Sequence, residues 1–477
     1  MSLKVYNVLT RTKEEFVPLT PGIVKMYACG ITVSGDAHIG HAYQSVVFDV
    51  ITRYLRYLGY DVKYVRNYTD VDDKIINNAA KTGENPIDFA EKYMAQTDKE
   101  MDDLGNAHPS IMARATQCID DIINFVQKLI DSGHAYVSEF GDVYFRLNSF
   151  AEYGKLSHIQ TDKNDTGVRK DVEPGKLNDL DFALWKSAKP GEIAWKSPWG
   201  MGRPGWHIEC SAMNLKYLGE QIDIHGGGRD LVFPHHENEI AQSEALTGKQ
   251  FAKYWIHCGL VKVNGQKMSK SLNNGILLKD VLAKYDADTI RFALLRNTYS
   301  ADIDITDALL PESLKHVYKM YSVFAALKNR DFSNADSVKT DAKIQEIVVE
   351  FEKAMNDNFN TLEVIASAFG WFNFINSELA KKTTEYDLQK ISAKIKELFG
   401  VLNILQQNPE DYINKIKTNT LHQNGITEQD IEKSIAERAT AKQNKDWVTA
   451  DEIRAKLLKN GIVLKDAPDG TTWDIDL

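Results

Sequence analysis

His38 and His41 lie in a segment suited to binding a polyphosphate. They flank an Ile-Gly pair, after an apolar run and at the start of a helical pattern. At such a strand-to-helix turn the backbone N–H groups and the helix dipole attract phosphate, and Gly40 lets a nucleotide approach the backbone. Two histidines there can donate hydrogen bonds to an anion. The alternative is a pair of capping or core histidines, but the complete HIGH tetrapeptide favours phosphate binding.

A second basic segment lies in the middle of the chain, where Lys267 and Lys270 belong to the run KMSKS. A Lys/Ser loop of this kind can close on a polyphosphate and stabilise negative charge that develops in a transition state. The alternative is a solvated surface loop, which accounts for most Lys/Ser runs. The complete five-residue match favours phosphate chemistry where a nucleotide site is also present.

Four further residues could build a metal site. Cys29 ends the first apolar run and Cys210 ends the segment GWHIEC. His235 and Glu239 are four residues apart in an expected helix and therefore share one of its faces. Cys, Cys, His and Glu are a plausible set of zinc ligands. The alternative is a pair of buried structural cysteines, because residues so distant in the sequence are weak support for a shared site.

These residues need a scaffold, and the first part of the chain predicts one. Residues 23–29 are expected to form a buried strand, an apolar pattern with helical spacing runs from 40 to 58, and 61–67 favour a second strand. Gly59 is suited to ending the helix. Strand, loop, helix and strand make a βαβ unit, which implies a parallel sheet.

The rest of the chain divides into a mixed part and a helical part. Residues 133–200 have turn dipeptides and short alternating runs, and we interpret them as an insertion between two halves of the sheet. The polar stretch 408–426 is expected to be a linker or a mobile segment. The other expected elements are helices at 110–132, 235–246, 314–329, 344–356, 361–379 and 427–459, strands at 222–225 and 254–258, and a hairpin turn at Asn264-Gly265.

Composition limits the class of protein. The 477 residues are 43% apolar and 26% charged, typical of a globular protein, and the length favours about three domains. A net charge of −10 argues against an unspecific nucleic-acid binder. Four cysteines are too few for a disulfide framework, and Cys118 and Cys258 are expected as buried small side chains. Neither a signal peptide nor a membrane span is expected, which favours a cytoplasmic protein.

The two phosphate-binding motifs together mark class I aminoacyl-tRNA synthetases, and longer segments resemble one family of that class. YACGITVSGDAHIGHA, NYTDVDDKI, GRPGWHIECSAMN, DIHGGGRDLVFPHHENEIAQSEA and KMSKSLNN are similar to cysteinyl-tRNA synthetases. The C-terminal NKDWVTADEIRAKLLKNGIVLKDAPDGTTW is similar to the end of the same family. The resemblance covers essentially the whole chain.

The resemblance implies an α/β fold: a Rossmann-type catalytic domain with an insertion, an α-helical domain and a small anticodon-binding domain. We expect the following boundaries: the first half of the catalytic domain at 1–120, the insertion at 121–200, the second half at 201–260, the KMSKS loop and stem-contact region at 261–310, the helical bundle at 311–407, and a linker with the C-terminal domain at 408–477.

The resemblance also implies a reaction and its partners. ATP, accompanied by Mg²⁺, would activate L-cysteine, and the cysteinyl group would pass to tRNA-Cys, with the protein acting as a monomer. Cys29, Cys210, His235 and Glu239 would bind one Zn²⁺, and the substrate thiolate would join its ligands. His38, His41, Lys267 and Lys270 would act on the phosphates. In HHENE we assign His235 to the metal, because adjacent helical residues do not share a face.

Other residues are candidates for substrate contacts. The glycine run would let the backbone approach the adenosine, and four polar or aromatic residues near the motifs would contact the amino acid, although each could be structural. These residues are Gly226, Gly227 and Gly228 for the nucleotide, and Thr69, Trp206, His225 and Asp230 for the amino acid. Two other functions stay open: a ligase that joins cysteine to a small amine, and a non-catalytic zinc- or RNA-binding derivative of a synthetase.

Overall fold

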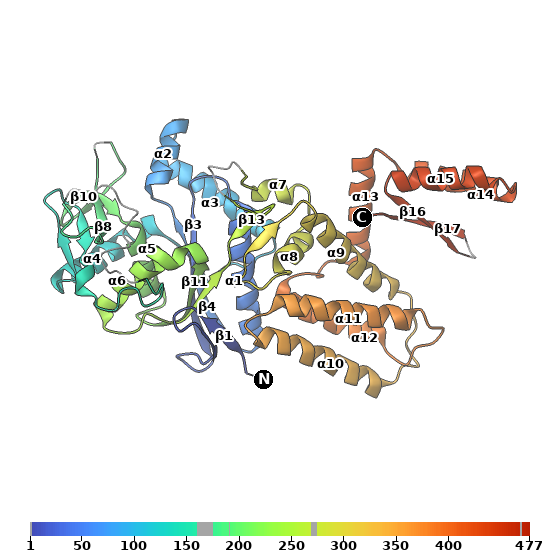
Figure 1. The fold of residues 1–477 in the computed structure, drawn as a ribbon, viewed down its shortest axis with the longest axis horizontal. Helices are drawn as coiled ribbons and strands as arrows, with labels where there is room; N and C mark the ends of the chain where they lie inside the picture. The colour runs from blue at the N-terminus through green and yellow to red at the C-terminus, as the bar shows by residue number, and fades with distance from the viewer. Residues whose placement is uncertain (1, 160–174, 190, 269–273, 468–469) are drawn as a thin grey trace. The chain divides into compact units, whose positions relative to one another are not determined.

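The computed structural model describes residues 2–159, 175–189, 191–268, 274–467 and 470–477 (Figure 1). The chain forms two compact units. The first comprises residues 1–305, 349–367 and 401–403, and the second comprises 306–348, 368–400 and 404–477. No helix of the described residues is long and apolar enough to cross a membrane.

The first unit is built on a five-stranded sheet in the order β12-β11-β3-β4-β5, with every pair parallel. Its strands are β3 (Ile23–Thr32), β4 (Asp61–Thr69), β5 (Ile111–Arg114), β11 (Ile222–Gly228) and β12 (Ala252–Cys258). From the central strand β3, the chain adds β4 and β5 on one side, and later adds β11 and β12 on the other side of β3. The gap between the carboxyl ends of β3 and β11 is thus a topological switch point, where doubly wound sheets bind ligands.

The predicted βαβ unit is confirmed as β3, α1 (Ile39–Tyr57) and β4. Helix α1 is buried along most of its length because it carries apolar residues on several faces, including Val46, Val50 and Leu55. Gly59 follows the helix with φ +89°, a conformation that favours glycine. The other helices of this part are α2 (Asp73–Thr82), α3 (Pro86–Asp103), α4 (Ile119–Asp131), α5 (Trp206–Tyr217) and α6 (Glu237–Thr247).

The prediction of one helix over 110–132 is wrong at its start. Residues 111–114 form the edge strand β5, which pairs with β4 from Val65↔Ile111 to Tyr68↔Arg114. Only the later part is helical, as α4. Four residues are too few to show a strand period, and the neighbouring strand decides their conformation.

The insertion is confirmed as a separate, antiparallel sheet in the order β6-β7-β8-β10-β9. Trp185 and Phe145 are fully buried in the core associated with it. Its strands are β6 (Ala135–Val137), β7 (Val143–Phe145), β8 (Phe182–Ser187), β9 (Trp195–Ser197) and β10 (Gly200–Pro204).

A hairpin follows the parallel sheet. β13 (Val261–Val263) and β14 (Gln266–Lys267) pair antiparallel across Asn264 and Gly265, both at positive φ, as the turn signal predicts. β13 also pairs in parallel with β15 (Ile303–Ile305). The remaining elements of the first unit include β1 (Lys4–Asn7), β2 (Thr12–Glu15), α7 (Leu278–Leu282) and α8 (Ala287–Leu295).

The second part of the chain is mainly helical. α9 (Leu309–Ala326), α10 (Ser337–Asn356), α11 (Thr361–Leu379) and α12 (Leu388–Leu402) follow one another, and the three predicted helices in this region are confirmed. The linker expected at 408–426 is wrong: residues 409–424 form α13 (Pro409–Asn424). Asn408 caps this helix, and its residues Tyr412, Ile416 and Leu421 are buried. These few apolar residues are hidden among many polar ones in the sequence.

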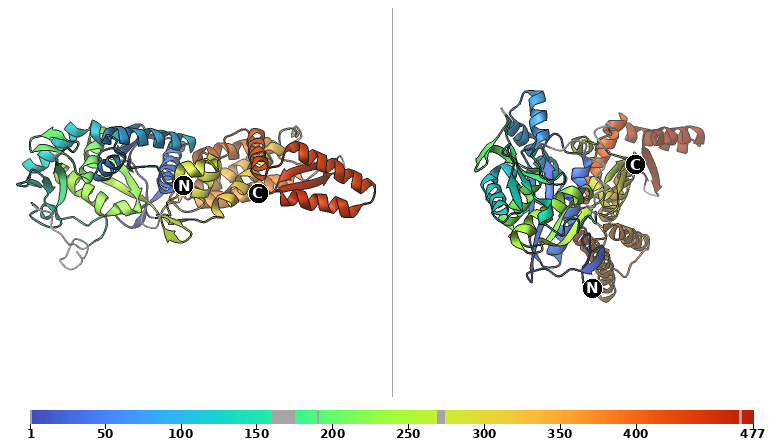
Figure 2. Two further views of the ribbon diagram at one scale, coloured as in Figure 1. Left: turned by 90° about the horizontal axis from the view of Figure 1, so that it is seen from above. Right: turned by 60° about the vertical axis from the view of Figure 1, so that its left-hand side comes forward.

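The C-terminal residues form two helices and a hairpin, seen at the red end of the ribbon in Figure 2. The single helix predicted at 427–459 is in fact α14 (Glu428–Gln443) and α15 (Trp447–Lys459). The break is at Lys445, which has φ +60°, and Asp446 then caps α15. β16 (Ile462–Ala467) and β17 (Gly470–Ile475) pair antiparallel, and Asp466 holds Arg438 of α14 through two hydrogen bonds.

Candidate active site and metal cluster

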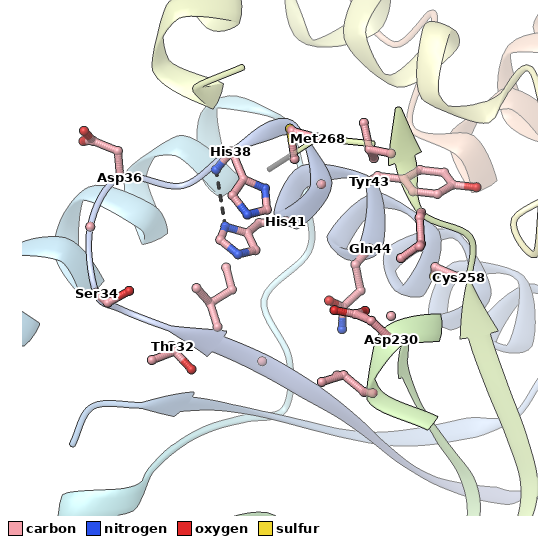
Figure 3. Close-up of a pocket in the computed structure, with 18 of the residues that line it drawn as sticks. Thr32, Ser34, Asp36, His38, His41, Tyr43, Gln44, Asp230, Cys258 and Met268 are labelled. Carbon is pink, nitrogen blue, oxygen red and sulfur yellow. Dashed lines mark hydrogen bonds between the residues drawn. The ribbon is translucent and has the colours of Figure 1, made fainter. Parts of the chain in front are cut away.

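A cavity of about 560 Å³ opens at the switch point between β3 and β11 (Figure 3). Gly30 and Thr32 line it from β3, His38 and His41 from the start of α1, and Asp230 from the turn after β11. Lys267 and Met268 line it from the hairpin. The sheet topology therefore brings the HIGH motif and the first residues of KMSKS to one cavity, although they are far apart in the sequence.

The two motif histidines stand face to face at the N-terminus of α1. Their rings stack with centroids 3.6 Å apart, and Nδ1 of His41 accepts a hydrogen bond from the backbone N–H of His38 at 3.3 Å (Figure 3). A Cβ atom at Gly40 would lie 3.0 Å from Nδ1 of His38, so glycine gives that ring its space. Both histidines remain partly exposed to the cavity.

The KMSKS segment is only partly described. Lys267 is exposed at the end of β14, and its carbonyl oxygen accepts a hydrogen bond from Asn274 at 3.2 Å. The side chain of Met268 reaches within 3.4 Å of a Cβ position at Gly40, which places the two motifs side by side. Lys270 lies outside the described residues.

The glycine run has a different structural role from the one predicted. Gly226 and Gly227 are buried and do not line the cavity, whereas Gly228 does. A Cβ atom at Gly226 would lie 2.4 Å from the Ile256 carbonyl oxygen and 2.4 Å from the Phe48 ring. Gly226 thus allows β11 to pack against β12 and α1, and Gly227 gives space to the side chains of Leu231 and His236. Only Gly228, with Asp230 beside it, is placed to approach a nucleotide.

Beside the cavity, Cys29, Cys210, His235 and Glu239 form a buried cluster, each at most 3% exposed. Their ligand atoms all lie within 4.8 Å of one another. The Sγ atoms of the cysteines are 3.6 Å apart, Cys210 Sγ is 3.6 Å from His235 Nε2, Cys29 Sγ is 3.4 Å from Glu239 Oε1, and His235 Nε2 is 3.1 Å from Glu239 Oε1.

These distances fit a tetrahedral metal ion. Ligand bonds of about 2.0–2.3 Å give tetrahedral edges of roughly 3.3–3.8 Å between donor atoms, and the four measured edges lie at or close to that range. The donors are two sulfurs, a nitrogen and a carboxylate oxygen, all of them zinc-ligand types. The cluster could therefore hold one metal ion.

The charges of the cluster are also suited to a cation. The hydrogen bond from Cys29 lowers the pKa of the Cys210 thiol to about 6, although burial opposes this. Burial opposes ionisation of Glu239 too, but His225 and His235 hold its pKa well below the ordinary value. Burial raises the pKa of Cys29, as does its partnership with Cys210. A thiolate and a carboxylate thus share one dry site, where a metal ion stabilises both.

Neighbouring residues orient the four ligands. His225, expected to contact the amino acid, instead bonds Oε2 of Glu239 through Nε2 at 2.8 Å and is fully buried. Nδ1 of His207 lies 3.0 Å from Nδ1 of His235, opposite the nitrogen that faces the cluster. Such outer hydrogen bonds fix the orientation of metal ligands. Sequence reasoning missed His207, because nothing in its spacing relates it to His235.

The expectation that only one of the adjacent histidines His235 and His236 can reach the cysteines is wrong. Nε2 of His236 lies 3.3 Å from Cys29 Sγ, so both adjacent histidines reach the cysteines. The two histidines reach different cysteines, since His235 lies beside Cys210 and His236 beside Cys29. Both end the π-helical turn at 232–236, which contains the non-helical Phe233 and directly precedes α6. Cys29, His225 and His236 form a second group with metal-binding geometry.

Of the remaining candidates, Trp206 joins the cluster to the cavity, whereas Thr69 does not line the cavity. Trp206 lines the cavity and stacks on His235 with ring centroids 4.2 Å apart. Thr69 is buried, and its hydroxyl donates to Glu209 at 2.8 Å. Gln44, which the sequence did not single out, lines the cavity and donates to the Cys29 carbonyl oxygen at 2.6 Å.

Comparison with protein families agrees with this geometry. A model of the tRNA synthetases class I (C) catalytic domain matches residues 15–315. A DALR domain matches 350–406, and a cysteinyl-tRNA ligase anticodon binding domain matches 428–473. The parallel sheet and the two motifs at its switch point define a class I aminoacyl-tRNA synthetase.

Full-length relatives identify the family more closely. The chain is 47% identical over 490 residues to the cysteine–tRNA ligase of Thermodesulfovibrio yellowstonii and 47% identical over 485 residues to that of Geobacter metallireducens, with 100% of each chain covered. The chain belongs to the cysteinyl-tRNA synthetase family.

Solved structures of other synthetases share the fold. A Mycobacterium tuberculosis methionyl-tRNA synthetase in complex with methionyl-adenylate has a TM-score of 0.57 at 16% identity, covering 80% of this chain and 89% of that one. A leucyl enzyme from Agrobacterium radiobacter, in a ternary complex with tRNA, has a TM-score of 0.60 at 12% identity, covering 83% and 87%. At these identities the likeness concerns the fold alone.

Proposed function

We propose that this chain activates L-cysteine with ATP to form cysteinyl-adenylate and transfers the cysteinyl group to tRNA-Cys. The main support for the proposal is that the cavity and the cluster lie next to each other. Gly30 lines the cavity directly after Cys29, and Trp206 joins the cavity wall to His235. A substrate with its sulfur at the cluster would extend its carboxylate toward a nucleotide in the cavity. Membership of the family supports the same activity.

The cluster is proposed to hold one Zn²⁺ through Cys29, Cys210, His235 and Glu239. When bound, zinc would supply a borderline-soft Lewis acid that takes a thiolate far better than a hydroxyl. Cysteine and serine differ by one atom, and a pocket that selects by shape alone separates such near-isosteres by only ~10²-fold. Recognition of the sulfur itself would raise this ratio. His225 and His207 would keep Glu239 and His235 in their orientation.

The cavity is proposed to hold ATP with its Mg²⁺. His38 and His41 would donate hydrogen bonds to the phosphates from the N-terminus of α1, where the helix dipole adds to the attraction. Lys267 and Lys270 would neutralise the pyrophosphate as it leaves. The cysteine carboxylate is the nucleophile and needs no general base, so positioning and electrostatic stabilisation would provide the rate.

Gly228 is proposed to approach the adenosine, and Asp230, Trp206 and Thr69 to contact the amino acid. Gly226 and Gly227 are better explained by packing, and His225 by its bond to Glu239.

The second step would use the C-terminal part of the chain. The family match at 428–473 supports anticodon binding by α14, α15 and the β16–β17 hairpin. Trp447 begins α15 and is 60% exposed, so it is not a core residue and is free to stack on a base. The helical domain, proposed at 311–407, would brace the tRNA. We propose a cytoplasmic monomer with the domain boundaries expected from the sequence, except that helix α13 replaces the expected linker.

The proposal is tested by ATP–pyrophosphate exchange with zinc-loaded protein. Exchange should depend on cysteine, should be far weaker with serine, and should not need tRNA. Charging of tRNA-Cys should follow when tRNA is added. If the zinc-loaded protein shows no exchange, the enzyme proposal is refuted. Exchange without charging of any tRNA would instead identify a ligase that joins cysteine to a small amine.

A further inference from the structure

Asp302 lies directly before β15 and joins three groups from two other elements. Its Oδ1 accepts the backbone N–H of Leu260 at 3.0 Å, and its Oδ2 lies 3.2 Å from Nζ of Lys262. The guanidinium of Arg229 also pairs with Oδ1. Neither motif nor spacing draws attention to this residue, and none of the roles given above involves it.

The groups that Asp302 joins follow the ends of two neighbouring strands that line the cavity, β11 and β12. Arg229 stands between Gly228 and Asp230, both of which line the cavity after β11. Leu260 lines it after the end of β12, just before β13 begins. β13 then leads through the hairpin to Lys267. The carboxylate therefore connects the wall beside the proposed adenosine contacts to the base of the lysine-bearing hairpin.

The surrounding backbone leaves little room for adjustment. A Cβ atom at Gly259 would lie 1.9 Å from the Ala301 carbonyl oxygen, so the chain before β13 and the chain before β15 are in close contact. At the other end of the hairpin, the carboxylate of Asp304 accepts the N–H of Gly265 at 3.0 Å. β15 thus holds the hairpin at its base and at its turn.

We propose that Asp302 is a positioning residue for the nucleotide site: it fixes the hairpin that carries Lys267 relative to Arg229 and the cavity wall at the end of β11. This inference rests on the proposed ATP-binding function. Exposed ion pairs such as those with Arg229 and Lys262 contribute little singly. The hydrogen bond that the backbone N–H of Leu260 donates to the Asp302 carboxylate is charge-assisted and stronger. Loss of Asp302 should therefore weaken ATP binding more than loss of either cation.

The test compares Asp302→Ala, Asp302→Asn and Arg229→Met in the zinc-loaded, full-length protein. In the exchange assay, Asp302→Ala should raise KM for ATP about ten-fold, the effect of losing a charge-assisted hydrogen bond of ordinary strength. Its kcat and its KM for cysteine should stay within about two-fold of wild type. Asp302→Asn keeps an oxygen for the Leu260 N–H and should restore most of the ATP affinity.

Arg229→Met should raise KM for ATP by no more than about two-fold, because an exposed ion pair contributes little, and should add nothing in the Asp302→Ala background. Glu220→Gln, which removes the exposed Glu220–Lys249 pair, is the matched control and should have no effect. Zinc content and melting temperature should stay at wild-type values in all variants. The inference is overturned if Asp302→Ala leaves KM for ATP unchanged, or if it alters kcat, both KM values and the melting temperature together. Absence of exchange in the wild type would instead refute the proposed function.

Discussion

Gly226→Ala separates two explanations of the glycine run. If the glycine serves a nucleotide, alanine should impair ATP binding in a folded protein. If it serves packing, alanine should destabilise the fold. The structure favours packing, because the added Cβ would lie 2.4 Å from both the Ile256 carbonyl oxygen and the Phe48 ring. Ile256 faces Gly226 across the β11–β12 pair, and Ala28 faces it on the other side, so the site is in the centre of the sheet.

The size of the effect follows from these distances. Carbon and oxygen atoms in ordinary contact are about 3.5 Å apart, so the strands and α1 must together give way by roughly 1 Å. Overpacking a well-packed core costs about 1–3 kcal/mol, and the upper end applies here because one obstructing atom is a backbone carbonyl in a sheet. A loss of about 3 kcal/mol lowers the melting temperature of a unit of this size by roughly 4 °C.

The assay is thermal unfolding of the zinc-loaded protein, with KM for ATP measured well below the transition. Gly275→Ala is the control, since a Cβ there meets no atom within 4 Å and the residue has no positive φ. We expect a clear drop in melting temperature for Gly226→Ala and none for the control. A Gly226→Ala protein with wild-type stability and a strongly raised KM for ATP would show that the packing argument is wrong.

Three further predictions concern the cluster, the motif histidines and the C-terminal hairpin. Cys210→Ser should lower zinc affinity by at least about 100-fold, because loss of an outer hydrogen bond to a ligand already costs 10–100-fold. The preference for cysteine over serine should fall together with the zinc affinity. A zinc-free variant that still prefers cysteine would refute the metal argument. His41→Asn should slow exchange by about 100-fold, as for loss of one donor to a developing charge, while zinc content, measured by metal analysis, stays unchanged. Hydrogen bonds from Arg438, Lys442 and Thr471 hold the pKa of Asp466 below its ordinary value, so this carboxylate stabilises the hairpin above about pH 5 and loses that effect as the pH falls further. Hydrogen exchange of peptides from 428–475 should therefore differ between wild type and Asp466→Asn at pH 6, and the difference should shrink toward pH 3.5.

The sequence predicted those parts of the fold whose pattern is local. The βαβ unit, the Asn264-Gly265 hairpin and the helices at 314–329 and 361–379 were all visible as apolar periods or turn residues. The errors occurred where a partner decides the conformation. Residues 111–114 are a strand because β4 lies beside them, and 408–426 is a helix because its few apolar side chains are buried by neighbouring elements.

The candidate site shows the same division. Motif residues such as His38 and Lys267 were found by type and spacing, whereas the four cluster residues were a plausible ligand set that the family resemblance singled out. His236 was excluded on the geometry of a regular helix, and the π-helical turn at 232–236 could not be foreseen from the letters HHENE. His207 and Asp302 act through contacts between distant segments, which leave no signal in a single sequence.

Helix α1 links the two halves of the proposed chemistry. Its first turn carries His38 and His41 at the phosphate end of the cavity, and its next residues include Gln44, which holds the Cys29 carbonyl oxygen at 2.6 Å. Cys29 is the last residue before the cavity and a member of the cluster. One rigid helix thus sets the distance between the group that would bind the substrate sulfur and the groups that would bind the phosphates. Holding two reactants in a fixed geometry is worth several kcal/mol, about 7–11 in favourable cases. The attack by the carboxylate needs no general base. We therefore expect the fixed distance between the cluster and the motif histidines to contribute more to the rate of the first step than any single proton transfer.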